Sequence, residues 1–268
     1  MKERFFMEKY ILSCSSIADL TAEQYKARNI KHIEIASNVN AKDIAEYFTP
    51  FLEDGYDILH VAASSGLSSF CNAADIAKEE LKKKYPKRKI YVIDSLGASA
   101  GYGLIMETLA DKRDEGAGFE ELAAWLKTNK LKVQHWGFFT DVKTFVKKGR
   151  ISKLAALKEK FLKVCPVVNM NYAGQIIPRI KIKGKNNVIK EIVKKMELLA
   201  DNGHDYSGKC YISYSSCYKA AKAVADVIEK TFPKLNGRVV INRMEAATAG
   251  YAGAGAVTLS FWGNERKD

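Results

Sequence analysis

Short apolar runs alternate with helical patterns along the first half of this sequence, and this alternation constrains the fold more than any other feature. The runs are rich in β-branched and aromatic side chains, which is typical of buried strands. The segments between them place apolar residues three and four positions apart, which is typical of helices with one buried face. The predicted strands span residues 9–14, 32–36, 57–63, 89–94 and 132–139, and the predicted helices span 41–54, 72–85 and 103–116.

The second half of the chain changes to a different pattern after about residue 152. Two apolar runs flank a turn at 171–174, which predicts an antiparallel hairpin. Two further helical patterns and three further strands follow. We therefore expect an α/β protein of two domains: residues 1–152, with a mostly parallel sheet covered by helices on both faces, and residues 153–268, a smaller α/β unit with a mixed sheet. No long linker separates them, so we expect the domains to pack closely and form a cleft.

The net charge of +12 suggests nucleic acid as a partner, because Lys and Arg displace counterions from a phosphate backbone. The basic residues are, however, spread along the chain and interleaved with apolar residues at helical spacing, as on solvated helix faces. Neither an aromatic ribonucleoprotein motif nor a Cys/His finger accompanies them. We expect no nucleic-acid partner, although a basic patch could equally receive an acidic protein or a phosphorylated ligand.

Cysteine and histidine usage argues against disulfides, metals and cofactors. The five cysteines are scattered without C-x-x-C spacing, which predicts reduced thiols. The four histidines lack the H-E-x-x-H spacing of a zinc site, and we interpret His60 as a core residue.

No apolar stretch is long enough to span a membrane, and the first ten residues lack the apolar segment of a signal peptide. We therefore expect a cytoplasmic protein without stable membrane insertion.

Two serine pairs surround a glycine in the segment AASSGLSSFCNAADIA, residues 62–77. The segment joins a predicted strand to a predicted helix, where ligands of parallel α/β sheets collect and helix N–H groups are unpaired. Ser64, Ser65, Ser68 and Ser69 could therefore hold a carboxylate or phosphate. Alternatively, one serine caps the helix and the others fill a turn. Spacing alone does not decide between these roles.

A second serine-containing junction, GASAG at residues 97–101, matches the G-x-S-x-G nucleophile elbow of α/β-hydrolases. In this alternative Ser99 is the nucleophile of an acyl ester hydrolase, with Asp201 and His204 as its partners. Asp94, Ser95 and Leu96 separate the last apolar residue of the strand from the motif, whereas an elbow turns directly off the strand. Small residues here are equally suited to close packing of a helix on a sheet. For Asp94, at the strand end, we favour hydrogen bonds to nearby backbone N–H groups over an acid–base role.

Six motifs, in order along nearly the whole chain, resemble the DegV family. They are ILSCSSIADL near the start, ASSGLSS followed by NAA, VIDSLGASAGYG, DVKTFVKKGRIS, LKVCPVVN with GQIIPRIKIKGK, and GYAGAGAVTLSFW near the end. Any one of these matches would carry little weight. Together, at suitable separations, they are specific.

The resemblance implies a bacterial, non-catalytic protein of two α/β domains that binds one long-chain fatty acid and no other cofactor. The tail would lie in a tunnel in the first domain, residues 1–152, with the carboxylate near the domain interface. Members of the family present the carboxyl group to a separate fatty acid kinase subunit. By position, Ser68 would bind the carboxylate, with Ser69 and Ser65 beside it. Arg150 matches a basic position of the family and could belong to the head-group site near the interface, or form a surface salt bridge instead.

Two parts of the family pattern differ in this sequence. The usual T-S-Q-P-S motif, whose Thr–Ser pair contributes to the head-group site, is missing between residues 36 and 57. The usual H-x-G-P-G reads YAGAG, so Tyr251 stands where the family has histidine. Tyrosine can still donate a hydrogen bond, but it cannot become a cation near neutral pH. We therefore expect an altered head-group site that includes Tyr251.

Overall fold

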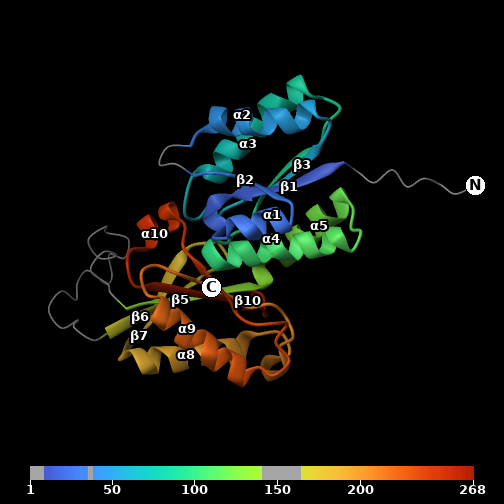
Figure 1. Cartoon of the computed structure of the whole chain (residues 1–268). Helices are drawn as coiled ribbons and strands as arrows, with labels where there is room; N and C mark the ends of the chain where they lie inside the picture. Colours follow the sequence, from blue (N-terminus) through green and yellow to red (C-terminus); the bar gives the residue numbers. More distant parts are fainter. Residues whose placement is uncertain (1–8, 36–38, 141–163) are drawn as a thin grey trace, which may run out of the picture.

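The computed structural model describes residues 9–35, 39–140 and 164–268, and it arranges them around two sheets that lie one above the other (Figure 1). The first sheet has four parallel strands in the order β2-β1-β3-β4. They are β1 (Tyr10–Ser15), β2 (Ile30–Ile33), β3 (Asp57–Ala62) and β4 (Ile90–Asp94). The parallel sheet predicted from the first half of the sequence is confirmed.

Helices cover both faces of the first sheet. One face carries α2 (Ala41–Glu53) and α3 (Phe70–Lys84), and the other carries α4 (Ser99–Asp114) and α5 (Phe119–Asn129). Successive strand residues point to opposite faces, so Ile58 packs in the cluster with α2 and α3 while Leu59 packs in the cluster with α4 and α5. The short helix α1 (Ala22–Ala27) contacts β2.

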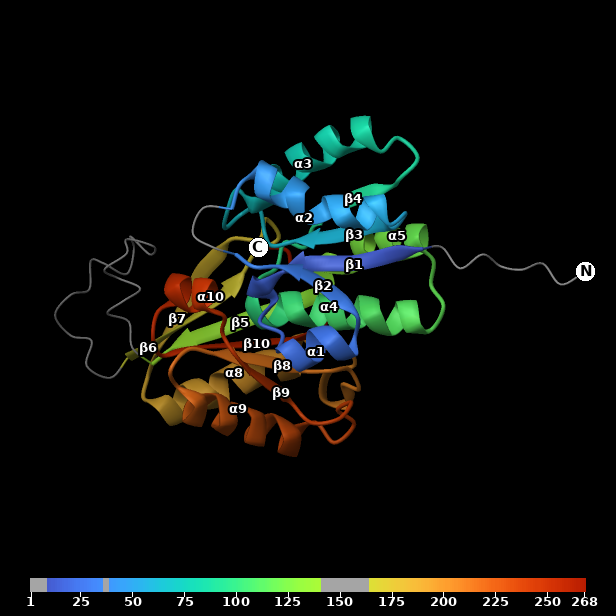
Figure 2. The ribbon, with the colours of Figure 1, turned by 45° about the horizontal axis from the view of Figure 1, so that its top comes forward.

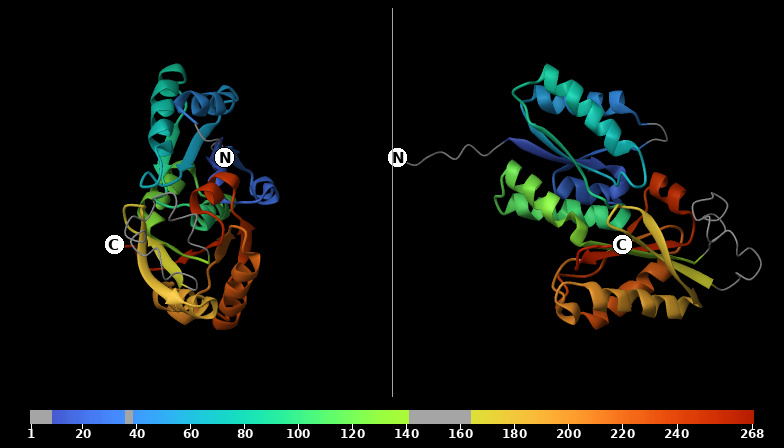
Figure 3. Two further views of the ribbon diagram at one scale, coloured as in Figure 1. Left: turned by 90° about the vertical axis from the view of Figure 1, so that its left-hand side faces the viewer. Right: turned by 180° about the vertical axis from the view of Figure 1, so that it is seen from behind.

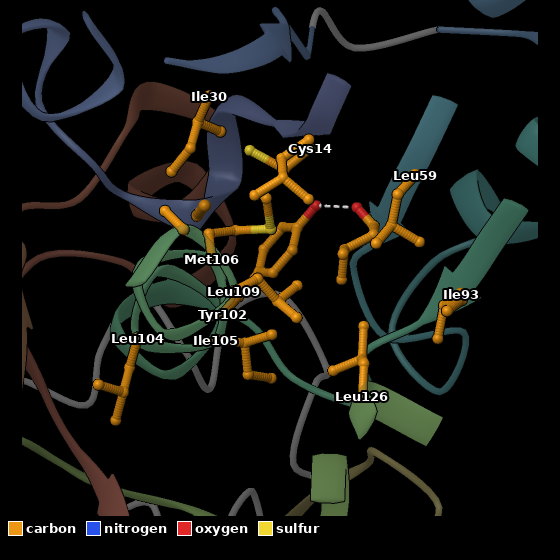
Figure 4. Close-up of a cluster of buried hydrophobic side chains, with 14 of the residues drawn as sticks. Cys14, Ile30, Leu59, Ile93, Tyr102, Leu104, Ile105, Met106, Leu109 and Leu126 are labelled. Carbon is orange, nitrogen blue, oxygen red and sulfur yellow. Dashed lines mark hydrogen bonds between the residues drawn. The ribbon is translucent and has the colours of Figure 1, made fainter. Parts of the chain in front are cut away.

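Tyr102 shows how tightly α4 is joined to the first sheet (Figure 4). Its ring is fully buried, and its hydroxyl donates to the backbone carbonyl of Val61 on β3. The same oxygen accepts from the backbone N–H of Ser15 at 3.0 Å. A buried phenol needs such partners, since an unpaired hydroxyl in an apolar interior costs free energy. The start of α4 is therefore fixed beneath the ends of β1 and β3.

The second sheet has six strands in the order β7-β6-β5-β10-β8-β9, and only β8 and β9 are parallel. The predicted mixed sheet is therefore confirmed, and β6 and β7 form the predicted hairpin. The strands are β5 (Val133–Phe139), β6 (Val164–Met170), β7 (Ile176–Lys183), β8 (Tyr211–Tyr214), β9 (Val240–Arg243) and β10 (Ala256–Trp262).

Strand β5 does not join the first sheet, although the sequence analysis grouped it with the first four strands. It pairs antiparallel with β10 and β6 in the second sheet. All seven of its residues are buried, so its sequence lacks the alternation that would distinguish one sheet from the other. The predicted domain boundary at 152 lies outside the described residues.

Helix α4 lies between the two sheets and contacts both (Figures 2 and 3). The opposite face of the second sheet is covered by α8 (Lys185–Leu199) and α9 (Tyr218–Thr231), while α10 (Ala246–Ala252) lies on the side of the first domain. Single turns of 3-10 helix lie at Ser16–Ala18, Lys130–Lys132 and Gly203–Asp205. The close packing of the two predicted units thus results largely from one shared helix.

Candidate ligand-binding site

Ser64, at the end of β3, joins the two halves of the molecule. Its side chain is fully buried, and its hydroxyl donates to the carbonyl of Gly174 in the β6–β7 turn at 2.7 Å. The same oxygen accepts from the N–H of Gly66 at 3.2 Å. A Cβ on Gly66 would lie 2.5 Å from the carbonyl oxygen of Ala173, so this loop and the hairpin are in direct contact. The first serine of the cluster therefore has a structural role.

We expect Ser64→Ala to lower the free energy of unfolding by about 2 kcal/mol, because it leaves the buried Gly174 carbonyl without this donor. Urea unfolding monitored by tryptophan fluorescence would measure the change. Ser65→Ala is the matched control, since the Ser65 side chain is exposed and the structure describes no hydrogen bond from its hydroxyl. Equal unfolding midpoints for the two variants would contradict the assignment.

The other three serines of the cluster, Ser65, Ser68 and Ser69, are exposed. The Ser68 hydroxyl accepts from the N–H of Phe70 at 3.4 Å, in the turn that leads into α3. Ser69 occupies the cap position, but its side chain makes no capping hydrogen bond. The structure therefore shows Ser68 in a turn, and it shows no serine side chain at a capping bond of α3. The hydroxyls of Ser65 and Ser69 remain at the surface beside it.

Asp94 organises the neighbouring loop, as expected for a residue at a strand end. Its carboxylate accepts from the N–H of Leu96 at 2.8 Å and from the N–H of Ser65 at 3.3 Å. The Lys130 ammonium group donates to its backbone carbonyl at 2.8 Å. The structural role predicted for Asp94 is confirmed. The two serine-containing loops also prove to be neighbours, since one carboxylate bonds to both.

A small apolar cavity of about 90 Å³ lies between these loops and the second sheet. Its floor is formed by residues of β5, β6 and β10, Gly137 among them. Leu67 of the serine-rich loop and Tyr251 of α10 belong to its wall. Further apolar lining comes from Phe139, Val168, Met170, Ile176, Met244, Ala252 and Ala256. Of the predicted head-group residues that the structure describes, Ser65, Ser68, Ser69 and Tyr251, only Tyr251 lines this cavity.

One side of the cavity is polar. Ser99, His135, Thr258 and Ser260 lie there, supplied by α4, β5 and β10. Burial, with Arg266 nearby, lowers the pKa of His135 well below its ordinary value, while a hydrogen bond to the Ala98 carbonyl opposes this change. The imidazole is therefore neutral near pH 7.

Ser99 is bonded to a buried carboxylate, that of Asp19. Its hydroxyl donates to Asp19 Oδ2 at 2.5 Å, and the N–H of Glu245 donates to Asp19 Oδ1 at 2.9 Å. Burial raises the pKa of Asp19 to about 6, although these hydrogen bonds act to lower it. Both residues have a positive φ, 54° for Ser99 and 53° for Asp19, which is uncommon for residues other than glycine. Such backbone strain is often found at functional sites.

The structure does not assemble the catalytic triad considered for Ser99. The N–H of Asp201 donates to the carbonyl of Trp262, at the far end of β10, and the His204 ring lies 6.0 Å from that of Phe232. Neither residue is described as bonded to Ser99, whose partner is a carboxylate. A serine nucleophile is activated by an adjacent base, normally histidine. The GASAG residues instead form the start of α4, the helix that packs between the two sheets.

Two candidate residues from the sequence analysis remain, Arg150 and His60. Arg150 lies outside the described residues. His60 is a core residue as expected: it is fully buried and its Nδ1 is 2.9 Å from the Ser13 hydroxyl.

Among residues 9–35, 39–140 and 164–268, no group of three His, Cys, Asp or Glu side chains could hold a metal ion, and no helix is long and apolar enough to cross a membrane.

Two residues of the site, Asp19 and His135, were not identified from the sequence. Asp19 lies in a segment whose only signal was its part in a family motif, and it reaches Ser99 from 80 positions away. His135 was interpreted as a residue of a buried strand, which is correct, but its position against the cavity depends on the second sheet. The unusual polar residues Thr258 and Ser260 in an otherwise apolar strand were the available signal.

The fold and the site define a two-domain α/β protein with an apolar cavity between a serine-rich strand end and a second, mixed sheet. A family described as "Uncharacterised protein, DegV family" matches residues 13–264. This chain therefore belongs to the DegV family, as its motifs predicted. A DegV domain-containing protein of Clostridium perfringens is 28% identical over 231 residues, which are 86% of this chain and 78% of the relative.

Solved structures share the fold at low sequence identity. A DegV lipid-binding protein from Thermotoga maritima superimposes with a TM-score of 0.81 at 19% identity, over 97% of this chain and all of that one. The fatty acid kinase B3 protein of Streptococcus pneumoniae, loaded with linoleic acid, gives 0.79 at 20% identity, over 96% and 100%. A DegV family protein from Eubacterium eligens, loaded with heptadecanoic acid, gives 0.78 at 18% identity, over 95% and 100%.

Proposed function

We propose that this protein binds one long-chain fatty acid without transforming it, with the tail in the apolar cavity over the second sheet. The observation that carries the proposal is the cavity itself, whose lining is largely apolar and includes Leu67, the neighbour of three exposed serines. Proteins of the same fold and family have been solved with linoleic and heptadecanoic acid bound. Burial of an acyl chain contributes about 0.8 kcal/mol per methylene, so the tail supplies most of the affinity.

This proposal moves the tail from the first domain, where the family resemblance put it, to the interface with the second sheet. Both faces of the first sheet are occupied by packed apolar clusters formed with its helices. The cavity has about 90 Å³, whereas ligand pockets typically have roughly 300 to 1,000 Å³. A long acyl chain must therefore extend beyond it or push its walls apart.

The head group would lie at the mouth of the cavity, near Leu67 and Tyr251. Leu67 lines the cavity, and its neighbours Ser65, Ser68 and Ser69 are exposed, so their hydroxyls would be available to a head group on this side. The start of α3, a helix of 15 residues, adds a partial positive charge there. These groups would bind the carboxylate, with Ser68 as its main side-chain donor. The bound acid would then be presented to a fatty acid kinase subunit.

Mass spectrometry of the lipid extracted from natively purified protein tests the proposal directly. We expect a stoichiometric fatty acid and, for Ser68→Ala, about a tenfold weaker affinity, because a lost hydrogen bond to a charged group costs about 1.5 to 3 kcal/mol. Ser207→Ala, an exposed serine of the second domain, is the matched control. A protein that neither carries nor binds a fatty acid would refute the function. A change below twofold in Ser68→Ala would refute only the head-group assignment.

A further inference from the structure

Two buried polar side chains lie on neighbouring strands of the second sheet at the polar side of the cavity, and an unsubstituted acyl chain gives their unpaired atoms no partner. His135 on β5 and Ser260 on β10 are cross-strand neighbours, and both residues line the cavity. Within the part of the chain that the structure describes, His135 Nε2 and Ser260 Oγ make no hydrogen bond. A buried polar atom without a partner costs free energy, and native proteins contain few of them.

The protonation of His135 defines the partner that its Nε2 requires. The ring is neutral because burial opposes its charge, and it donates one hydrogen bond, to the carbonyl of Ala98. Since Nε2 is the nitrogen without a partner, the donor is Nδ1. In a neutral imidazole the other nitrogen is an acceptor. His135 Nε2 therefore needs a donor, whereas the Ser260 hydroxyl can donate or accept.

An alcohol carries both the donor and the acceptor that these two atoms require. It can donate its proton to His135 Nε2 and accept the proton of the Ser260 hydroxyl. A carboxylate, ester or ketone only accepts and would leave Nε2 unpaired. The carboxyl group of Asp19, one hydrogen bond behind Ser99 on the same side of the cavity, also disfavours an anion there.

We propose that the cavity selects a hydroxylated fatty acid, with the hydroxyl group bound between His135 and Ser260. This inference rests on the proposed fatty acid binding and specifies its ligand class. Ala256, near the Tyr251 end of the cavity, is four residues from Ser260 along β10, which corresponds to about 14 Å. With the carboxylate near Tyr251, the hydroxyl therefore belongs to the middle or the end of the acyl chain and not to the carbon next to the head group.

Competition binding tests this inference with palmitic acid and its terminal-hydroxy, mid-chain-hydroxy and 2-hydroxy derivatives as probes. Dissociation constants would be measured by displacement of a fluorescent fatty acid from the full chain. We expect the terminal or mid-chain derivative to bind about tenfold more tightly than palmitic acid, and the 2-hydroxy derivative to show no such preference. In Ser260→Ala the preference should fall to about twofold or less. Ser213→Ala is the matched control, because its hydroxyl on β8 is as deeply buried as that of Ser260 but does not line the cavity.

The outcomes separate this inference from the proposed function. If palmitic acid and every hydroxylated derivative bind equally, the inference is overturned while fatty acid binding stands; a bound water would then satisfy the two atoms. A preference that survives in Ser260→Ala, or falls equally in Ser213→Ala, overturns the assigned position. Failure of all four acids to bind overturns the proposed function and this inference with it.

Discussion

Replacing Gly101 with alanine should lower the free energy of unfolding by about 3 kcal/mol, at the upper end of what overpacking usually costs. A Cβ at this position of α4 would lie less than 3.0 Å from two ring atoms of His135 and 2.8 Å from the Ser260 hydroxyl. The ring is buried and held by its hydrogen bond to Ala98, so it cannot turn aside without losing that bond. Overpacking of an interior side chain forces strained rotamers or a shift of the helix.

Gly250→Ala is the control for this substitution, because Gly250 also lies in a helix but a Cβ there would meet nothing within 4 Å. Alanine in a helix is more favourable than glycine by roughly 0.5 to 1 kcal/mol, so this variant should be slightly more stable than the wild type. Urea unfolding of the two variants and the wild type gives the comparison. Equal midpoints for Gly101→Ala and the wild type would show that α4 is not packed against His135 in this way.

The sequence predicted the first sheet well because local pattern and final environment agree there. The run 57–63 is apolar at nearly every position, and β3 is indeed buried on both faces between two layers of helices. Strand β5 has the same kind of pattern and was therefore grouped with the first sheet. Its true partner, β10, begins more than a hundred residues later, and no property of the run 132–139 identifies it. Pairing of distant strands depends on the whole fold.

The candidate site was predicted in part for a similar reason. The parallel order of β3 and β4 implied that the loops after Ser64 and Asp94 meet at one edge, and they do. The role of Ser64 was not predictable, because its partner Gly174 lies 110 positions away in the other half of the chain. A hydroxyl that joins two domains and a hydroxyl that binds a carboxylate have the same local sequence. Only the tertiary contact separates them.

Asp19→Asn should remove a pH dependence of stability that arises from one buried carboxyl group. Asparagine keeps an oxygen for the N–H of Glu245 and a polar group beside Ser99, but it does not titrate. Burial raises the pKa of Asp19 from 3.8 to about 6 in the folded protein. Between these two values the folded protein holds a proton that the unfolded chain has released. Raising the pH through this range therefore lowers the free energy of unfolding.

The size of the effect follows from the same difference. A pKa of about 6 in place of 3.8 corresponds to about 3 kcal/mol. The free energy of unfolding of the wild type, minus that of Asp19→Asn, should thus fall by about 2.4 kcal/mol between pH 4 and pH 7, because the rest of the change lies mostly below pH 4. All other titrating groups are shared, so their contributions cancel in the difference. Urea titrations of both proteins across this range measure it, and a difference that stays constant with pH would mean that Asp19 is charged, and therefore solvated, in the folded protein.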